Sequence, residues 1–172
     1  MKLLVIGLAA ALACTGPAFA ARYYLVYHGE KGTAVVDRDA IQRRAGSIFE
    51  APLVAIRPNT APPSADFGYA VVVTEFDCGQ HEVSAGKVTL FADNGQLAQQ
   101  QPPDSDKPVL WGPPPSGTAA EAALAFVCAP ARQRTKLAVY LRRLTLQEIV
   151  SKARSGDDLA QASAARHRRR SR

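Results

Sequence analysis

Alternation of apolar and polar positions predicts a series of β-strands that begins at residue 23 and ends with a strand from residue 97 onward, before a polar loop at residues 99–108. The clearest strand covers residues 68–78, where successive side chains point to opposite faces. One face carries Ala70, Val72, Thr74, Phe76 and Cys78, and the other carries Tyr69, Val71, Val73, Glu75 and Asp77. Cys78 is therefore expected beside Phe76 on the more apolar face.

Turn signals separate this strand from its expected neighbours. Strands are expected at residues 23–27, 33–36, 47–57, 68–78 and 83–92, and from residue 97 onward. Asn94-Gly95 fits the positive φ angles of a type I′ hairpin turn, so the chain is expected to return antiparallel there. Pro52 cannot donate a ladder hydrogen bond, which indicates an edge position or a bulge. For residues 37–46 we expect only a connection with one helical turn.

A helix is predicted after these strands. Thr118 and Glu121 have the spacing of a capping box, which starts a helix that runs to Cys128. Its apolar stripe consists of Leu124, Val127 and Cys128. A strand and a helix that each present a cysteine on an apolar side can be joined by a disulfide. The predicted fold class is therefore α+β, an antiparallel meander with one helix tethered to a face of the sheet.

A second capping box, Thr145 with Glu148, predicts another helix that ends before Gly156. Its apolar stripe consists of Leu146, Ile149, Val150 and Ala153. Together with the apolar residues 137–144, this segment is expected to fold against the domain. Small and polar residues follow from position 156, and they have too little apolar surface to bury, so disorder is expected there.

The first twenty residues have the pattern of an export signal. One lysine precedes an apolar run over residues 3–13, and small residues at positions 18 and 20 match the pattern that signal peptidase reads. Cleavage is expected between Ala20 and Ala21. The apolar run has about half the length of a membrane-spanning helix. The mature chain is therefore expected in the periplasm, at the outer membrane surface or outside the cell.

A competing interpretation takes Cys14 as the lipid-bearing cysteine of a lipoprotein, because Leu12 and Ala13 precede it as in a lipobox. Ala11 occupies the position where that motif prefers a bulky aliphatic residue, so cleavage after position 20 is favoured. The predicted organisation is a signal over residues 1–20, one domain over 21–130, and a basic extension, helical and then disordered, over 131–172.

Charge is divided unevenly between the domain and the extension. Residues 21–128 hold 8 Lys and Arg against 12 Asp and Glu, whereas residues 129–172 hold 12 against 3. Guanidinium groups bind phosphates and carboxylates, so the terminal arginines are expected to bind anionic lipid, lipopolysaccharide or acidic glycans rather than nucleic acid. These are Arg166, Arg168, Arg169, Arg170 and Arg172. A purely solubilising tail is the alternative.

Cysteine and histidine usage limits the possible chemistry. Cys78 and Cys128 remain after removal of the signal, and such a pair normally forms a disulfide in an oxidising compartment. Two buried thiols or a metal site are the alternatives, but neither cysteine lies in a CxxC and the three histidines lack ligand spacing. The sequence also has no nucleophile motif or Gly-rich phosphate loop. No enzyme activity, metal or cofactor is therefore expected.

Several short motifs occur in an order that is known from one family. They are Tyr24, residues 37–41, residues 75–78, Asn94-Gly95, Trp111 with Pro115-Ser116, and Val127-Cys128. In this order the chain resembles the bacterial surface-adhesin protein E domain over about residues 22–128. The resemblance implies a small secreted fold in which one disulfide tethers an antiparallel sheet to a helix. The chain departs from the family pattern in its opening tyrosine, in Ala40 and in its weak lipobox.

The resemblance implies binding to host matrix proteins, as in family members that are adhesins. The predicted function is a non-catalytic envelope or surface binding module that contacts host or matrix proteins. The alternative is an envelope structural or accessory protein that its arginine-rich tail holds to anionic lipid or lipopolysaccharide. No particular protein partner follows from the sequence.

Overall fold

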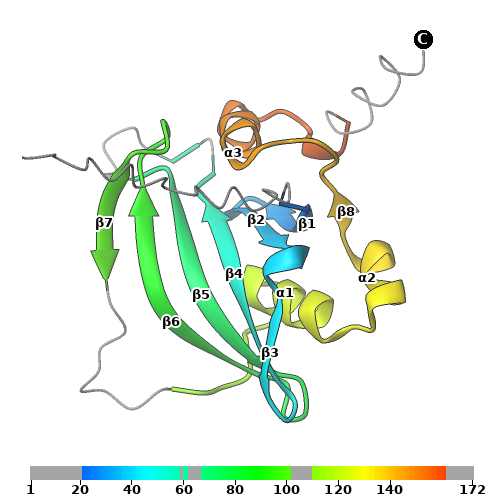
Figure 1. Cartoon of the computed structure of the whole chain (residues 1–172). Helices are drawn as coiled ribbons and strands as arrows, with labels where there is room; N and C mark the ends of the chain where they lie inside the picture. Colours follow the sequence, from blue (N-terminus) through cyan, green and yellow to red (C-terminus); the bar gives the residue numbers. More distant parts are fainter. Residues whose placement is uncertain (1–20, 59, 62–66, 102–109, 162–172) are drawn as a thin grey trace, which may run out of the picture.

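The computed structural model describes residues 21–58, 60–61, 67–101 and 110–161. Their strands are β1 (Tyr23–Gly29), β2 (Gly32–Asp37), β3 (Gln42–Ala45), β4 (Ile48–Ile56), β5 (Tyr69–Asp77), β6 (Glu82–Phe91), β7 (Leu97–Gln101) and β8 (Val139–Tyr140). They form one antiparallel sheet in the order β7-β6-β5-β4-β2-β1-β8, and β3 pairs with β4 (Figure 1). The predicted meander is confirmed, because consecutive strands from β4 to β7 are hydrogen-bonded neighbours.

Short helices pack against this sheet, so the predicted α+β class is confirmed. The described helices are η1 (Arg38–Ala40), α1 (Ala119–Cys128), α2 (Ala131–Leu137) and α3 (Leu146–Ser155). Successive residues of β2 alternate between two hydrophobic clusters, because Val36 packs with α1 and Val35 packs with α3. The helices α1 and α3 therefore cover opposite faces of the sheet.

The first hydrophobic core lies between α1 and the face of the sheet that contains Phe76. Its buried members are Tyr24, Ala34, Val36, Ala51, Leu53, Phe76, Ala123, Leu124, Phe126 and Val127. Leu124 and Val127 come from the predicted stripe, and Phe126 is also fully buried. The ring of Tyr24 lies 5.1 Å from that of Phe126. Its buried members all precede α2, and the partly buried Ala138 and Tyr140 from beyond α2 pack against it.

The second hydrophobic core lies on the opposite face, and it joins the sheet to the C-terminal extension. The sheet contributes Val35, Val54, Ile56 and Tyr69, and the extension contributes Leu141, Leu144, Ile149, Val150, Ala153 and Leu159. The predicted stripe of α3 is thus largely buried. Leu159 is buried as well, which corrects the expectation of disorder from Gly156 onward. The arginine tail lies outside the described residues.

The expectation that Pro52 marks an edge or a bulge is wrong. Pro52 lies in β4, an interior strand that pairs in continuous register with β5. On the other side of β4, residues 53–56 pair with β2 and residues 48–50 pair with β3. Pro52 lies between these two pairings, at a position where neither β2 nor β3 supplies a partner. A proline is tolerated there because no ladder bond is missing.

Two other local expectations are also corrected. Residues 42–45 form strand β3 rather than a plain connection, and their uniform exposure explains why the sequence shows no alternation. The turn before β7 is not of type I′, since Asn94 has no positive φ angle and only Gly95 does, at 85°. The amide of Gly95 donates to the carbonyl of Ala92, and the glycine closes the turn as it does in hairpins with a bulge.

Both predicted helix starts are confirmed. The hydroxyl of Thr118 accepts from the amide of Glu121, and that of Thr145 accepts from the amide of Glu148. Only the second is a full reciprocal capping box, because the carboxylate of Glu121 accepts instead from the amide of Gly117. These caps satisfy amides that a helix cannot pair internally.

Candidate functional site

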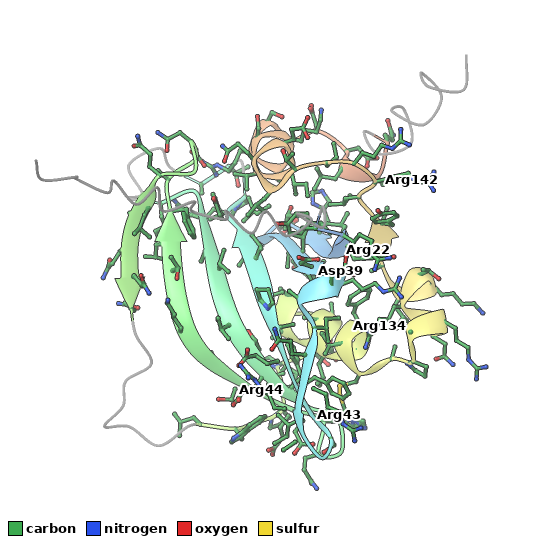
Figure 2. The ribbon with its side chains drawn as sticks, viewed as in Figure 1. Arg22, Asp39, Arg43, Arg44, Arg134 and Arg142 are labelled. Atoms are coloured by element: carbon green, nitrogen blue, oxygen red, sulfur yellow. A yellow bond between two sulfur atoms is a disulfide. The ribbon has the colours of Figure 1, made fainter. Side chains whose placement is uncertain are left out.

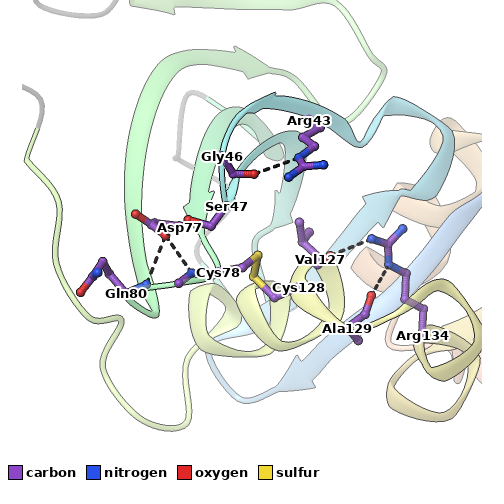
Figure 3. The surroundings of a disulfide bond; sticks show 11 residues. Arg43, Gly46, Ser47, Asp77, Cys78, Gln80, Val127, Cys128, Ala129 and Arg134 are labelled. Carbon is purple, nitrogen blue, oxygen red and sulfur yellow. Dashed lines mark hydrogen bonds between the residues drawn. A yellow bond between two sulfur atoms is a disulfide. The ribbon is translucent and has the colours of Figure 1, made fainter.

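A disulfide joins α1 to the end of β5, as expected. Cys78 and Cys128 are bonded, and their Cα atoms lie 5.3 Å apart (Figure 3). Cys78 begins the turn between β5 and β6, and Cys128 is the last residue of α1. The bond therefore fixes the C-terminal end of the helix against one end of the sheet.

Asp77 organises the turns at this end of the sheet. Its carboxylate accepts from the hydroxyl of Ser47 at 2.7 Å and from the amides of Gly79 and Gln80 at 2.8 and 3.1 Å (Figure 3). The amide of Cys78 also donates to the carbonyl of Ser47. These donors, with the Ser47 hydroxyl first, hold the pKa of Asp77 below its ordinary value. One carboxylate thus locks two turns together.

We call the exposed part of these turns the disulfide-end surface. It comprises Arg43, Arg44, Gly46, Ser47, Gly79, Gln80 and His81, all of them exposed. Arg43 donates to the carbonyl of Gly46, and Arg44 pairs with Glu50. His81 has a φ of 58°, a conformation that non-glycine residues adopt uncommonly. The surface offers polar donors and acceptors on a backbone that covalent and hydrogen bonds hold rigid.

Arg134, which comes from α2, contacts the end of α1 near the disulfide. Its guanidinium donates to the carbonyls of Val127 and Ala129 at 2.8 and 3.1 Å, and it lies 6.0 Å from the centroid of the Phe126 ring. Burial, followed by the charge of Arg38, lowers the pKa of Arg134. Arg134 therefore caps the end of α1 and holds α2 against it (Figure 3).

Apart from Ala21, the remaining residues predicted to carry function lie outside the described part of the chain. Ala21 is described, whereas Ala20, Cys14 and the tail arginines are not. Export cleavage, lipidation and anion binding by the tail therefore stay predictions. Among the described residues, no group of three or more His, Cys, Asp or Glu side chains is placed to hold a metal ion. No helix in this part of the chain is long and apolar enough to cross a membrane.

Sequence reasoning missed the roles of Asp77 and Arg134. For Asp77 a signal exists, because an aspartate followed two residues later by glycine is typical of a turn in which the side chain accepts from the backbone. No local pattern identifies the role of Arg134. Its acceptors are carbonyls at the end of the preceding helix, and the guanidinium reaches them only when α2 folds back.

The fold defines a small α+β domain, an antiparallel sheet with a helix tethered to one end by a single disulfide. The family model for surface-adhesin protein E matches residues 23–129, more than half of the chain, and the chain belongs to this family. Membership favours a non-enzymatic binding role and an exported or surface protein. No curated protein and no solved structure matches the chain. The match ends beside Cys128, so α2, β8 and α3 lie beyond it.

Proposed function

We propose that this chain is an exported, non-catalytic binding module of the cell envelope whose disulfide-end surface contacts a host or matrix protein. Family membership supports the class of function. The rigid turns at the disulfide support the choice of surface. The export signal is proposed to be removed by cleavage between Ala20 and Ala21, which leaves a mature chain that begins at Ala21.

The rigidity of the disulfide-end surface favours binding. Association costs free energy when loops become ordered, and turns that are already fixed in the free protein avoid most of this cost. Asp77 fixes the backbone, while Arg43 and Gln80 project into solvent beside it. Arginine is enriched in protein interfaces because it combines several donors with apolar stem contacts. A polar surface of this kind suits a reversible contact rather than a permanent one.

The test measures binding of the mature chain to a panel of purified extracellular-matrix proteins. Arg43→Glu combined with Gln80→Ala is expected to weaken the strongest interaction by about tenfold or more, the usual effect of removing interface anchors. Lys87→Glu, an exposed lysine on β6, is the matched control and is expected to bind like the parent. Equal binding by all three proteins would show that another surface carries the contact.

Cell-surface exposure is a separate requirement of this proposal. Protease treatment of intact cells is expected to remove the chain, because an adhesive module must reach its partner. Protection on intact cells, with digestion only after lysis, would instead support the accessory role inside the envelope.

That accessory role is the second candidate, in which the tail holds the protein to anionic lipid or lipopolysaccharide. The charge of the extension supports it, since residues 129–172 hold 12 basic against 3 acidic side chains. The proposed contacts are made by Arg166, Arg168, Arg169, Arg170 and Arg172. Replacing these five by glutamine in the full mature chain is expected to reduce binding to lipopolysaccharide at low salt, and the difference should shrink as salt rises. An unchanged affinity would make the tail a solubilising segment.

A further inference from the structure

The turn between β6 and β7 contains a reactive dipeptide that the proposed function does not use. Asn94 is exposed in this turn and is followed by Gly95. The backbone nitrogen that follows an asparagine can attack its side-chain amide carbon, and a glycine leaves this nitrogen unhindered because it has no Cβ. The only other asparagine of the sequence, Asn59, is followed by the β-branched Thr60. Asn94 is therefore the asparagine whose sequence context favours this reaction.

The hydrogen bonding of the turn brings the two reacting groups together. The side-chain oxygen of Asn94 accepts from the amide of Gln96 at 2.9 Å, so the side chain folds back along the backbone of Gly95. A donor on a carbonyl oxygen stabilises the negative charge that forms there when the carbon is attacked. The Gln96 amide therefore holds the Asn94 side chain in place and makes its carbon more reactive.

Two backbone hydrogen bonds oppose the reaction in the folded protein. The amide of Gly95 donates to the carbonyl of Ala92, and the amide of Ala92 donates to the carbonyl of Gln96, each at 2.9 Å. The Gly95 nitrogen can attack only when its own bond opens. Strand β7 ends the order of paired strands and all five of its residues are exposed, so opening of this hairpin uncovers little apolar surface. Such openings cost little free energy compared with global unfolding.

The same turn supports α3. The carbonyl of Asp93 accepts from the side chain of Gln147, and the carboxylate of Asp93 accepts from Arg154. A Cβ atom at position 95 would lie 2.7 Å from the side-chain oxygen of Gln147, so the turn and the helix are in close contact. A change in the backbone between residues 94 and 95 therefore alters the contacts that hold α3.

We propose that Asn94 is a site of spontaneous deamidation. The Gly95 nitrogen loses its proton and bonds to the side-chain carbonyl carbon of Asn94, while the side-chain nitrogen takes up a proton and leaves as ammonia. The product is a five-membered succinimide. Water then opens the ring at either carbonyl, which gives aspartate or isoaspartate at position 94. No enzyme, oxidant or cofactor takes part.

The modification weakens the turn on the α3 side of the molecule. Both products place a carboxylate next to that of Asp93, and like charges repel. Isoaspartate also adds the side-chain methylene to the backbone, which shifts Gly95 relative to Gln147. The inference goes beyond the proposed function, because Arg43 and Arg44 of the disulfide-end surface lie at the opposite end of the sheet from α3 and this turn (Figure 2).

The test incubates the folded mature chain in mildly alkaline buffer and follows each asparagine by peptide mapping and mass spectrometry. A synthetic peptide of residues 91–98 in the same buffer gives the rate without the fold. Most of Asn94 in the folded chain is expected to become aspartate and isoaspartate within about fifty half-lives of the peptide, because the turn must open first. Asn59 is expected to keep its amide. If Asn94 keeps its amide over the same time, the proposal is overturned.

Asn94→Ser is the matched control, since serine keeps an oxygen that can accept from Gln96 but has no amide to lose. After incubation the converted parent is expected to unfold at a urea concentration about 0.5 M lower than fresh protein, whereas fresh and incubated Asn94→Ser unfold alike. Amides of α3 are expected to exchange faster in the converted parent than in the control. If the converted parent unfolds and exchanges like fresh protein, the proposed effect of the modification on α3 is wrong.

Discussion

The two faces of the sheet are covered in different ways. On one face α1 is held by the Cys78–Cys128 bond and packs Phe126 against Tyr24. On the other face α3 has no covalent tether, and it is held by packing and by polar contacts to distant turns. Gln147 and Arg154 of α3 contact the carbonyl and the carboxylate of Asp93, and Arg154 also donates to the carbonyl of Pro58.

This difference separates two sources of stability. A disulfide acts mainly by restricting the unfolded chain, whereas apolar packing acts by removing surface from water in the folded chain. The α1 face lies within the region that matches the family, and the α3 face is completed by residues beyond it. Side chains that point to the two faces nevertheless alternate along the same strands, as Val35 and Val36 show. Among the described residues, one apolar face of the sheet is therefore covered by the extension.

The largest effect is expected from removing the extension. A chain of residues 21–130 would lose Leu141, Leu144, Ile149, Val150 and Leu159, each 4% exposed or less. At about 1.5–3 kcal/mol for each buried side chain, the loss is about 10 kcal/mol, similar to the whole stability of a domain. Far-ultraviolet circular dichroism and urea unfolding are expected to show an unfolded or aggregating chain.

A chain that ends at Gln161 is the matched control, since it keeps Leu159 and removes the arginine tail. It is expected to unfold at the same urea concentration as the full mature chain. If residues 21–130 alone unfold cooperatively and at a similar urea concentration, the second core contributes little and the comparison between the faces fails.

The next largest effect is expected from the disulfide. Replacing both Cys78 and Cys128 by alanine opens a loop of 50 residues, for which the chain-entropy model gives about 4 kcal/mol. The double variant is expected to fold with a lower free energy of unfolding, as measured in urea. Unfolded but unreduced parent protein is expected to show no reactive thiol. Two reactive thiols per chain would contradict the bond.

Sequence reasoning predicted the elements whose signals are local. Strand β5 alternates regularly, and the threonine caps of α1 and α3 have the expected partners three residues later. The disulfide followed from the compartment and from the count of two remaining cysteines. Each of these inferences depends on nearby residues or on composition, which a sequence displays directly.

The missed features depend on which segments meet in space. Strand β3 has four exposed polar or small residues, so it becomes a strand only because β4 offers it an open edge. Pro52 is tolerated inside the sheet because β4 changes partner there. The strand pattern places Asp77 on one face of β5 but does not indicate its role, because that role depends on the turns around Ser47 and Gln80 coming together.

Substitutions at the two helix caps compare the two faces with smaller expected changes in stability. Thr145→Ala and Thr118→Ala each remove a hydroxyl that accepts from a helix amide, and each is expected to lower the free energy of unfolding by about 1 kcal/mol. Thr135→Ala, an exposed position in α2, is the control and is expected to stay within about 0.5 kcal/mol of the parent. If Thr145→Ala has no effect, the cap does not contribute, and α3 is held by its packing and by the contacts of Gln147 and Arg154.

The smallest effect concerns acid, and it is expected only at the end of the sheet that carries the disulfide. The folded pKa of Asp77 lies below its unfolded value of about 3.9, so its contribution to stability is complete at higher pH and is lost as pH falls through the folded pKa. The difference in melting temperature between the parent and Asp77→Asn is therefore expected to be largest above pH 5 and to shrink toward pH 2. Ser47→Ala removes the donor that lowers this pKa most, so it should reduce the pH dependence without abolishing it. Hydrogen exchange identifies which amides lose protection in acid. Protection of the Gly79 and Gln80 amides should fall, while protection of the amides of α3 should change less. Equal loss of protection on both faces would mean that acid destabilises the whole sheet rather than the turns that Asp77 holds.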